Sequence, residues 1–207
     1  MNPRQAFSFL FLTLFALVGC DGNAAAACRS DRVGIETEFG MIVVQLYPKK
    51  APASAGDFLK YVDEGRYGGA GFYRVVRSDN DNGSPKIDAI QGGLPDTSGL
   101  PGIAHESTRT TGLRHVDGAL SLARGAPGTG NAGTFFIAIG DQPALDHGAA
   151  RNPDRQGFAV FGRVVSGMKV VRKIHAVPAA QLGGSDYTKG QILKNPILIR
   201  SARRLCD

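Results

Sequence analysis

The sequence predicts an all-β dominated fold, a barrel or a sandwich, with only two helices. Short runs of β-type residues recur along the chain and are separated by turn residues. The chain holds 28 glycines among its 207 residues, which suits many tight turns. Only two segments show helical spacing, so an alternating α/β fold, which needs a helix between successive strands, is not favoured.

Residues 1–19 are expected to form a signal peptide. Arg4 precedes the apolar run 7–18, which is too short to span a bilayer and is typical of a signal-peptide core. The run ends in Leu17-Val18-Gly19-Cys20, which resembles a bacterial lipobox, so we expect lipidation of Cys20 and a tether over residues 20–31. Cleavage within residues 24–27 is the alternative. Both interpretations place the protein in the bacterial cell envelope or periplasm, and the first anchors it to a membrane by lipid.

Residues 32–207 are expected to form one domain built mainly of strands. Strands are predicted at residues 33–37, 41–46, 72–76, 89–91, 119–123, 135–139, 158–165 and 192–200. The first two form a hairpin through a turn at Phe39-Gly40.

Two helices are predicted, at residues 51–63 and 168–175. The first carries Phe58 and Val62 at helical spacing and tolerates Pro52 in its first turn. The second places its apolar residues on one face in the same way.

The charge pattern does not point to nucleic acid. The formal charge is +6 and the isoelectric point about 9.4, but the basic residues are scattered from Lys49 to Arg204 without aromatic residues between them. The run 79–83 resembles the start of a calcium loop, yet Ile90 stands where the bidentate carboxylate is needed. The four histidines lack paired spacing, so neither a metal site nor another cofactor is expected.

Five ordered blocks carry a resemblance to a known family. They are FYRVV at 72–76, QGG at 91–93, GALSLAR at 118–124, TFFI at 134–137, and FAVFGRV at 158–164 leading to Gly167-Met168. Together they resemble the cyclophilin family of peptidyl-prolyl cis-trans isomerases, from about residue 32 to about residue 203. The resemblance implies a closed eight-stranded antiparallel β-barrel capped by two α-helices.

The resemblance also implies an activity, the isomerisation of X-Pro peptide bonds. This reaction is slow because amide resonance imposes a barrier of about 18–20 kcal/mol, and no bond need be broken to catalyse it. A donor aimed at the proline nitrogen favours the twisted transition state. Arg74 matches the family's catalytic arginine and offers permanently charged, rigidly arranged N–H groups. Gln91 matches the family's glutamine, which orients the arginine and binds the substrate carbonyl.

Seven further residues are expected to bind the substrate. Phe72 is placed on the same strand face as Arg74, and the backbone at two positions is expected to run alongside the peptide. By resemblance, the others line the proline pocket or stand beside it. The full set is Phe72, Ala123, Arg124, Thr134, Phe136, Leu145 and Phe158.

Several positions depart from the family pattern. Asp88 stands in place of a pocket phenylalanine, Ala144 in place of a tryptophan and Phe158 in place of a histidine. Thr134 replaces a glutamine and Arg124 an asparagine. Ile87 and Ile90 are both candidates to replace the missing aromatic ring. The alternative function is therefore a non-catalytic chaperone that binds proline peptides, or an envelope lipoprotein subunit.

The expected partners are proline-containing unfolded or nascent exported proteins, acted on by a monomer. Cysteine parity adds a further expectation. Once Cys20 is lipidated or removed, Cys28 and Cys206 remain in an oxidising compartment, where a free pair tends to form a disulfide. These two residues flank the first and last strands, which lie side by side in the family's barrel.

Overall fold

A computed structural model describes residues 30–180 and 185–206. The predicted signal peptide, the lipidation site Cys20 and the disulfide candidate Cys28 lie outside these residues.

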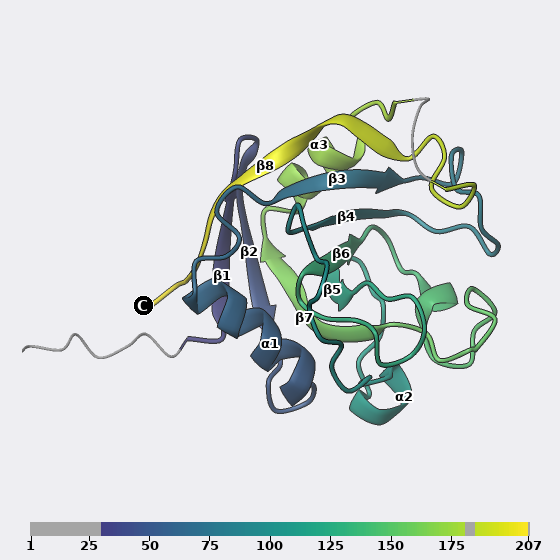
Figure 1. Ribbon diagram of the computed structural model, residues 1–207, viewed down its shortest axis with the longest axis horizontal. Helices are drawn as coiled ribbons and strands as arrows, with labels where there is room; N and C mark the ends of the chain where they lie inside the picture. The colour runs from purple at the N-terminus through teal and green to yellow at the C-terminus, as the bar shows by residue number, and fades with distance from the viewer. Residues whose placement is uncertain (1–29, 181–184, 207) are drawn as a thin grey trace, which may run out of the picture.

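Eight antiparallel strands close into a barrel, as predicted (Figure 1). Around the barrel the strands follow the order β1-β2-β7-β5-β6-β4-β3-β8, so the first and last strands pair with each other. The strands are β1 (Arg32–Thr37), β2 (Gly40–Leu46), β3 (Gly71–Val76), β4 (Ala89–Gly93), β5 (Ala119–Leu122), β6 (Thr134–Ala138), β7 (Ala159–Ser166) and β8 (Ile192–Arg204).

Two longer helices pack on the barrel, both where the sequence predicts them. The helix α1 (Pro52–Asp63) lies against β7 and β8, and α3 (Met168–His175) lies against β2, β3 and β4 (Figure 1). Two short elements were not predicted, because a single turn carries no periodic signal: α2 (Thr108–Thr111) and the 3-10 turn η1 (Pro143–Leu145). Within the described residues, no helix is long and apolar enough to cross a membrane.

The largest difference in strand bounds is at the C-terminus. The strand β8 extends four residues beyond its predicted end, because Ser201 to Arg204 continue the ladder with β1. These four residues are mostly polar and continue no hydrophobic pattern, so the sequence does not predict the extension. The other strand ends lie within two residues of their predicted positions.

An aromatic cluster fills the barrel beneath α1. The ring of Phe58 lies 5.1 Å from Tyr67, 5.5 Å from Phe135 and 5.2 Å from Phe161, and all four side chains are buried. The Tyr67 hydroxyl donates a 2.7 Å hydrogen bond to the carbonyl of Ala132. This bond ties the core to the segment that leads into β6.

A β-bulge in β3 decides which side chains leave the core. Phe72 pairs with Gly92 and Arg74 with Gln91, so Tyr73 is an extra residue in the ladder. As a result Tyr73 and Arg74 both point out of the barrel, whereas Phe72 and Val75 are fully buried in it.

The paired ends of the domain support the predicted disulfide. Val33 lies opposite Arg204, so Cys206 follows the last strand beside the first one. Cys206 is disulfide-bonded. Because Cys28 lies outside the described residues, its pairing with Cys206 stays a prediction.

We predict that the mature protein contains no free thiol and that a tryptic peptide links Cys28 to Cys206. Replacing Cys206 by serine should lower the free energy of unfolding by up to roughly 4–5 kcal/mol, because the bridge closes nearly the whole chain. Thiol titration under denaturing, non-reducing conditions measures the first point, and chemical denaturation measures the second. Two free thiols per chain would show that the bridge does not form.

Candidate active site

A second, smaller apolar cluster lies outside the barrel wall. Side chains on a strand alternate, so Phe135 packs inside the barrel while Phe136 points out. Phe136 and Leu145, with Phe158 packed against them, form one wall of a cavity of about 180 Å³. Arg74 and Gln91 border the same cavity. We call this cavity the proline pocket.

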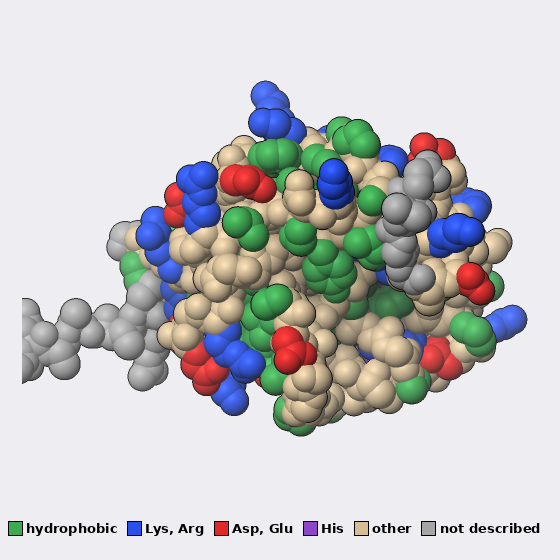
Figure 2. Space-filling model, turned by 45° about the horizontal axis from the view of Figure 1, so that its top comes forward, with side chains coloured by type: hydrophobic (Ala, Val, Ile, Leu, Met, Phe, Trp, Pro, Cys, Tyr) green, Lys and Arg blue, Asp and Glu red, His purple; other side chains and the backbone are tan. Residues whose placement is uncertain are grey.

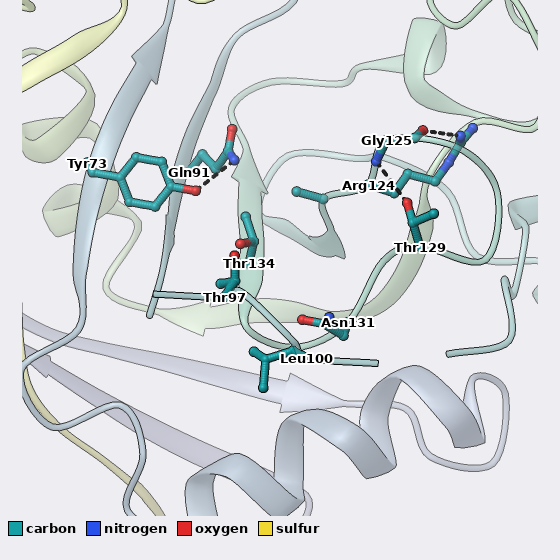
Figure 3. A pocket seen from close by; sticks show the side chains of 10 residues that line it. Tyr73, Gln91, Thr97, Leu100, Arg124, Gly125, Thr129, Asn131 and Thr134 are labelled. Carbon is teal, nitrogen blue, oxygen red and sulfur yellow. Dashed lines mark hydrogen bonds between the residues drawn. The ribbon is translucent and has the colours of Figure 1, made fainter. Parts of the chain in front are cut away.

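The structure brings together seven of the nine residues expected at the site. Arg74, Gln91, Ala123, Arg124, Phe136, Leu145 and Phe158 all border the proline pocket. Thr134 instead lines a neighbouring cavity of about 330 Å³, the middle cavity, which shares Gln91, Ala123 and Arg124 with the pocket (Figure 3).

The position expected for Phe72 is not the one observed. Its side chain is fully buried in the barrel, 5.8 Å from the ring of Phe135, and does not reach either cavity. Strict alternation would put Phe72 on the face of Arg74, but the bulge at Tyr73 reverses the sides. Tyr73 takes its place on the outer surface and lines the middle cavity (Figure 3).

The structure also decides between the two isoleucines near Asp88. Ile87 belongs to the outer cluster and borders the proline pocket, whereas Ile90 is fully buried inside the barrel. The Asp88 carboxylate lies 3.5 Å from the ring of His175. An aliphatic side chain therefore fills part of the missing aromatic wall.

Arg74 is held by two glutamines. Its Nη1 donates to Gln91 Oε1 at 2.8 Å, while its Nε and Nη2 donate to Gln191 Oε1 at 2.8 and 2.6 Å. Gln91 in turn donates from Nε2 to the Tyr73 hydroxyl at 2.9 Å (Figure 3). The two glutamines thus engage three of the five N–H groups of the guanidinium.

The acceptors around Arg74 are neutral. Among the described residues, no carboxylate forms an ion pair with it. Burial lowers the pKa of Arg74, although the arginine stays charged at physiological pH. Its positive charge is therefore not cancelled and acts on whatever enters the pocket.

Gln191 is a site residue that the sequence did not reveal. It is fully buried. Its backbone carbonyl accepts a 2.9 Å hydrogen bond from Val75 N, and its side-chain Nε2 donates to the backbone carbonyl of Asn80 at 2.9 Å. No short-range pattern connects positions 74 and 191, so only the closure of β8 on β3 brings them together.

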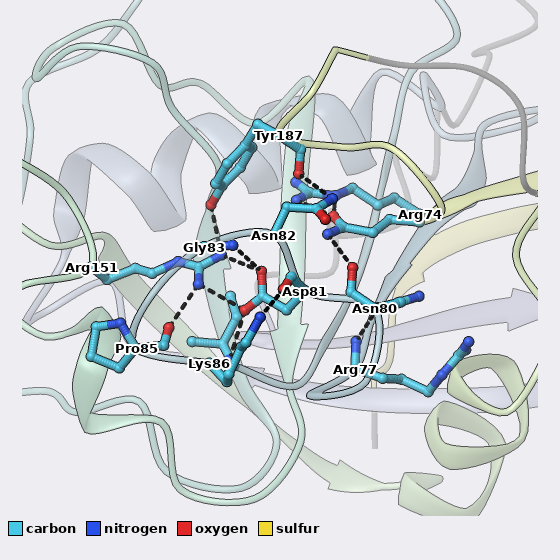
Figure 4. Close-up of polar contacts among 12 residues, drawn as sticks. Arg74, Arg77, Asn80, Asp81, Asn82, Gly83, Pro85, Lys86, Arg151 and Tyr187 are labelled. Carbon is cyan, nitrogen blue, oxygen red and sulfur yellow. Dashed lines mark hydrogen bonds and ion pairs between the residues drawn. The ribbon is translucent and has the colours of Figure 1, made fainter.

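Tyr187 is a second residue that the sequence missed. Its ring borders the proline pocket and lies 5.1 Å from the Arg74 guanidinium (Figure 4). Its hydroxyl accepts a 2.8 Å hydrogen bond from Arg151. Asn82 donates to the carbonyls of Tyr187 and Lys189, which fastens the turn that carries the ring. The pocket thus gains an aromatic wall from a loop.

A buried ion pair supports this wall. Arg151 donates to both carboxylate oxygens of Asp81 at 2.7 and 2.8 Å, and both side chains are excluded from solvent (Figure 4). A Cβ atom on Gly83 would collide with the Arg151 guanidinium, so a larger residue there would displace the arginine from its present position. The run 79–83 therefore acts as an anchor for the pocket, with Asp81 neutralised by arginine. Within the described residues, no group of three His, Cys, Asp or Glu could hold a metal ion.

Arg124 makes its own contacts beside the pocket. Its guanidinium binds both oxygens of Asp154 at 2.8 and 2.9 Å and lies 5.3 Å from the ring of Phe158. The hydrogen bonds from Arg124 hold the pKa of Asp154 at about 2.

A buried histidine underlies the pocket. The His115 ring stacks on Phe136 with 5.8 Å between centroids, and its Nδ1 lies 2.8 Å from Asp146. Its Nε2 lies 3.1 Å from the Ser121 hydroxyl. This order of groups matches a hydrolase triad, but Ser121 is 0% exposed and cannot reach a substrate. The three residues therefore support the pocket floor.

The arrangement suits one kind of chemistry. A charged donor at the rim of an apolar pocket can hydrogen-bond a nitrogen lone pair that appears only when an amide twists. Fold and site together define a closed β-barrel that carries an apolar pocket and a charged donor on its outer wall.

Comparisons with known proteins name the family. Residues 32–203 match the model of the cyclophilin type peptidyl-prolyl cis-trans isomerases. Peptidyl-prolyl cis-trans isomerase A of Dickeya dadantii is 34% identical, covering 87% of each chain. The isomerase cyp18 of Streptomyces antibioticus is also 34% identical, covering 84% of this chain and 98% of that one. The chain therefore belongs to the cyclophilin-type peptidyl-prolyl cis-trans isomerases and is an enzyme of that type.

Solved structures agree on the fold. The crystal structure of a cyclophilin type isomerase of Cryptosporidium parvum superposes with a TM-score of 0.65 at 21% identity, covering 86% of this chain and 98% of that one. That protein has also been crystallised in the presence of the dipeptide Ala-Pro, with a TM-score of 0.64.

We predict that stability falls as the solution is acidified, partly through His115. Burial lowers the pKa of His115 below 6.5, by more than the hydrogen bond to Asp146 raises it. The unfolded chain therefore binds a proton more readily, so this contribution to stability is present above about pH 6.5 and is lost as the pH falls below it.

The test compares wild type with His115→Asn. The melting temperature of each protein is measured by thermal unfolding at pH values from about 7.5 to about 5. The variant should be less stable at neutral pH, because it loses the stack on Phe136, but should respond less steeply to acid. An equal slope in both proteins would show that His115 is not the group that titrates.

Proposed function

We propose that this chain accelerates X-Pro isomerisation during the folding of exported proteins, with Arg74 as the catalytic donor. The proline ring enters the apolar pocket beside Phe136, and Arg74 donates to the proline nitrogen as the amide twists. The observation that carries this proposal is the guanidinium at the rim of the pocket, which two glutamines orient and which no carboxylate of the described residues pairs with.

Gln91 has a positioning role and a binding role in this proposal. Its Oε1 fixes Nη1 of Arg74, and its Nε2 has one hydrogen left after the bond to Tyr73. That hydrogen is the group we assign to the substrate carbonyl. Gln191 fixes the other side of the guanidinium, so the donor is already oriented before substrate binds.

We predict that Arg74→Ala lowers kcat/KM on a proline tetrapeptide by about 10²–10³, since a single transition-state donor is removed. Arg74→Lys should recover only part of the rate, because an ammonium keeps the charge but loses the rigid fork held by Gln91 and Gln191. The rate is followed by a coupled peptide assay and the fold by circular dichroism.

Arg66→Ala is the matched control. Arg66 lies over the ring of Tyr61, outside the site, and its removal should leave the rate unchanged. If folded Arg74→Ala retains the wild-type rate, Arg74 is not the donor. If wild type binds the peptide but shows no turnover, the non-catalytic chaperone is the better description.

The cellular setting we propose is the envelope of a bacterium, with a lipid on Cys20 and a monomeric domain on a short tether. The lipobox at Leu17 to Cys20 supports the lipid anchor in this proposal. The clients on this proposal are proline-containing proteins that fold after export.

We predict that Cys20→Ser moves the protein from the membrane fraction to the soluble fraction, because the lipid attached to that cysteine is the anchor. Cys28→Ser, which leaves the lipidation site intact, should stay with the membrane. Mass spectrometry of the mature N-terminus separates lipidation at Cys20 from cleavage within residues 24–27. Membrane retention of Cys20→Ser would exclude the lipid as the anchor.

A further inference from the structure

The site does not end at the middle cavity. A third cavity, of about 410 Å³, shares Tyr73, Thr97 and Thr134 with the middle cavity. We call it the distal cavity. The proline pocket, the middle cavity and the distal cavity thus form one continuous trough on the outer wall of the barrel.

The distal cavity is hollow because of its backbone. Gly69, Gly71 and Gly93 contribute no side chains to its floor. Opposite the bulge in β3, the pairing of β8 shifts from Ile192 to Ile197. Pro196 lies in this shifted stretch and packs close to Gly71 at the cavity.

The side chains that line the distal cavity are mostly apolar, and none is charged. Leu94, Pro95, Pro196, Leu198 and the ring of Tyr73 line it together with Thr97 and Thr134. An apolar side chain can be desolvated there, whereas a charged one would find no partner.

The local backbone holds Leu198 in an exposed position. Its neighbours Ile197 and Ile199 are buried, while Leu198 itself is 50% exposed. Its N–H donates to the Glu38 carboxylate at 3.2 Å and its carbonyl accepts from Glu38 N at 3.3 Å, so the backbone is fixed on both sides. Figure 2 shows hydrophobic side chains gathered beside a hollow on the face that carries β3 and β8.

The exposed apolar residues support a single trough. Four large hydrophobic side chains are exposed among the described residues: Met41, Val165, Tyr187 and Leu198. Two of the four border this trough, Tyr187 in the proline pocket and Leu198 in the distal cavity. Water-exposed apolar groups concentrated along one groove are typical of a binding surface.

We propose that the distal cavity binds an apolar side chain of the same polypeptide whose proline occupies the proline pocket. The occupant is the substrate itself, because the distal cavity is continuous with the site that holds the X-Pro bond. Leu198 pairs with Gly71, which lies two ladder positions from Arg74 because Tyr73 is the extra residue of the bulge. That separation is about 7 Å of strand, so an extended peptide that also passes over the Leu198 side chain covers it in about two to three residues.

The proposal rests on the proposed function and sharpens it. The preferred substrate is an unfolded segment with an apolar residue about two to three positions from its proline. Folded proteins bury such residues, so the distal cavity selects chains that have not yet folded.

The test uses fluorescent peptides of about nine residues with one central proline and otherwise polar sequence. One series carries leucine, and a matched series serine, at each position from about two to about five residues on either side of the proline. Affinity is measured by anisotropy, and turnover separately on a tetrapeptide too short to reach the distal cavity. Binding thus tests this proposal, while tetrapeptide turnover tests the proposed function.

We expect leucine about two to three residues from the proline, on one side only, to bind roughly fivefold to tenfold more tightly than serine. Leu198→Ser should abolish this preference, and Leu198→Phe should keep it. Val165→Ser is the matched control, since Val165 is 53% exposed but lies outside the trough.

Equal affinities for the leucine and serine peptides in wild type would overturn the proposal. So would an undiminished preference in Leu198→Ser. If Leu198→Ser instead leaves peptide affinity unchanged and converts a dimer to a monomer in sedimentation, the distal cavity binds a second copy of the chain, and the proposal is wrong.

Discussion

The bulge in β3 is the constraint on which the site depends. In a regular strand, Tyr73 and Arg74 would point to opposite sides of the sheet, and one of them would enter the barrel. The extra residue lets both point outward, so Tyr73 lines both the middle and the distal cavity while Arg74 borders the proline pocket. The lost ladder bonds are replaced in part by Val75 N, which donates to the carbonyl of Gln191. The same residue that repairs the backbone thereby presents its side chain to Arg74.

Among the described residues, the charges around the pocket leave Arg74 without a carboxylate partner. Arg124 is paired with Asp154 and Arg151 with Asp81, whereas Arg74 contacts two amide oxygens and the side chain of Tyr187. A carboxylate at position 91 or 191 would also orient the guanidinium, yet it would cancel the field that a developing lone pair experiences. Glutamine supplies the geometry without the opposing charge. Burying an ion pair often brings little stability, so the Asp81–Arg151 pair is better explained by its hold on Tyr187 than by its own energy.

Sequence patterns captured the barrel and most of the pocket for a physical reason. Alternating apolar strands and two amphipathic helices are local signals, and the residues matched to the family lie on those strands or next to them. What the sequence could not show depends on closure or on register. Phe72 was placed on the wrong face because a bulge leaves no trace in composition. Ile87 could not be separated from Ile90 because the sequence does not show the register of the segment that leads into β4. Gln191 and Tyr187 lie more than a hundred residues from Arg74 in sequence, and only the pairing of β3 with β8 brings them to it.

The pocket differs from the family pattern mainly in the parts that loops supply, because strands and loops hold different parts of it. The strands fix the donor and the floor, since Arg74, Gln91 and Phe136 sit on neighbouring strands whose spacing the closed ladder determines. The walls come from loops, and loops can change without cost to the barrel. Two family aromatics are absent at Asp88 and Ala144, while Ile87 and Tyr187 now border the pocket, the latter fastened through Asn82 and Arg151. Changes in such a loop wall change which substrate residues next to the proline fit the pocket. The donor that acts on the proline nitrogen keeps its position, because the strands hold it. Substrate preference can therefore diverge in this chain while the chemistry of the twisted amide is retained.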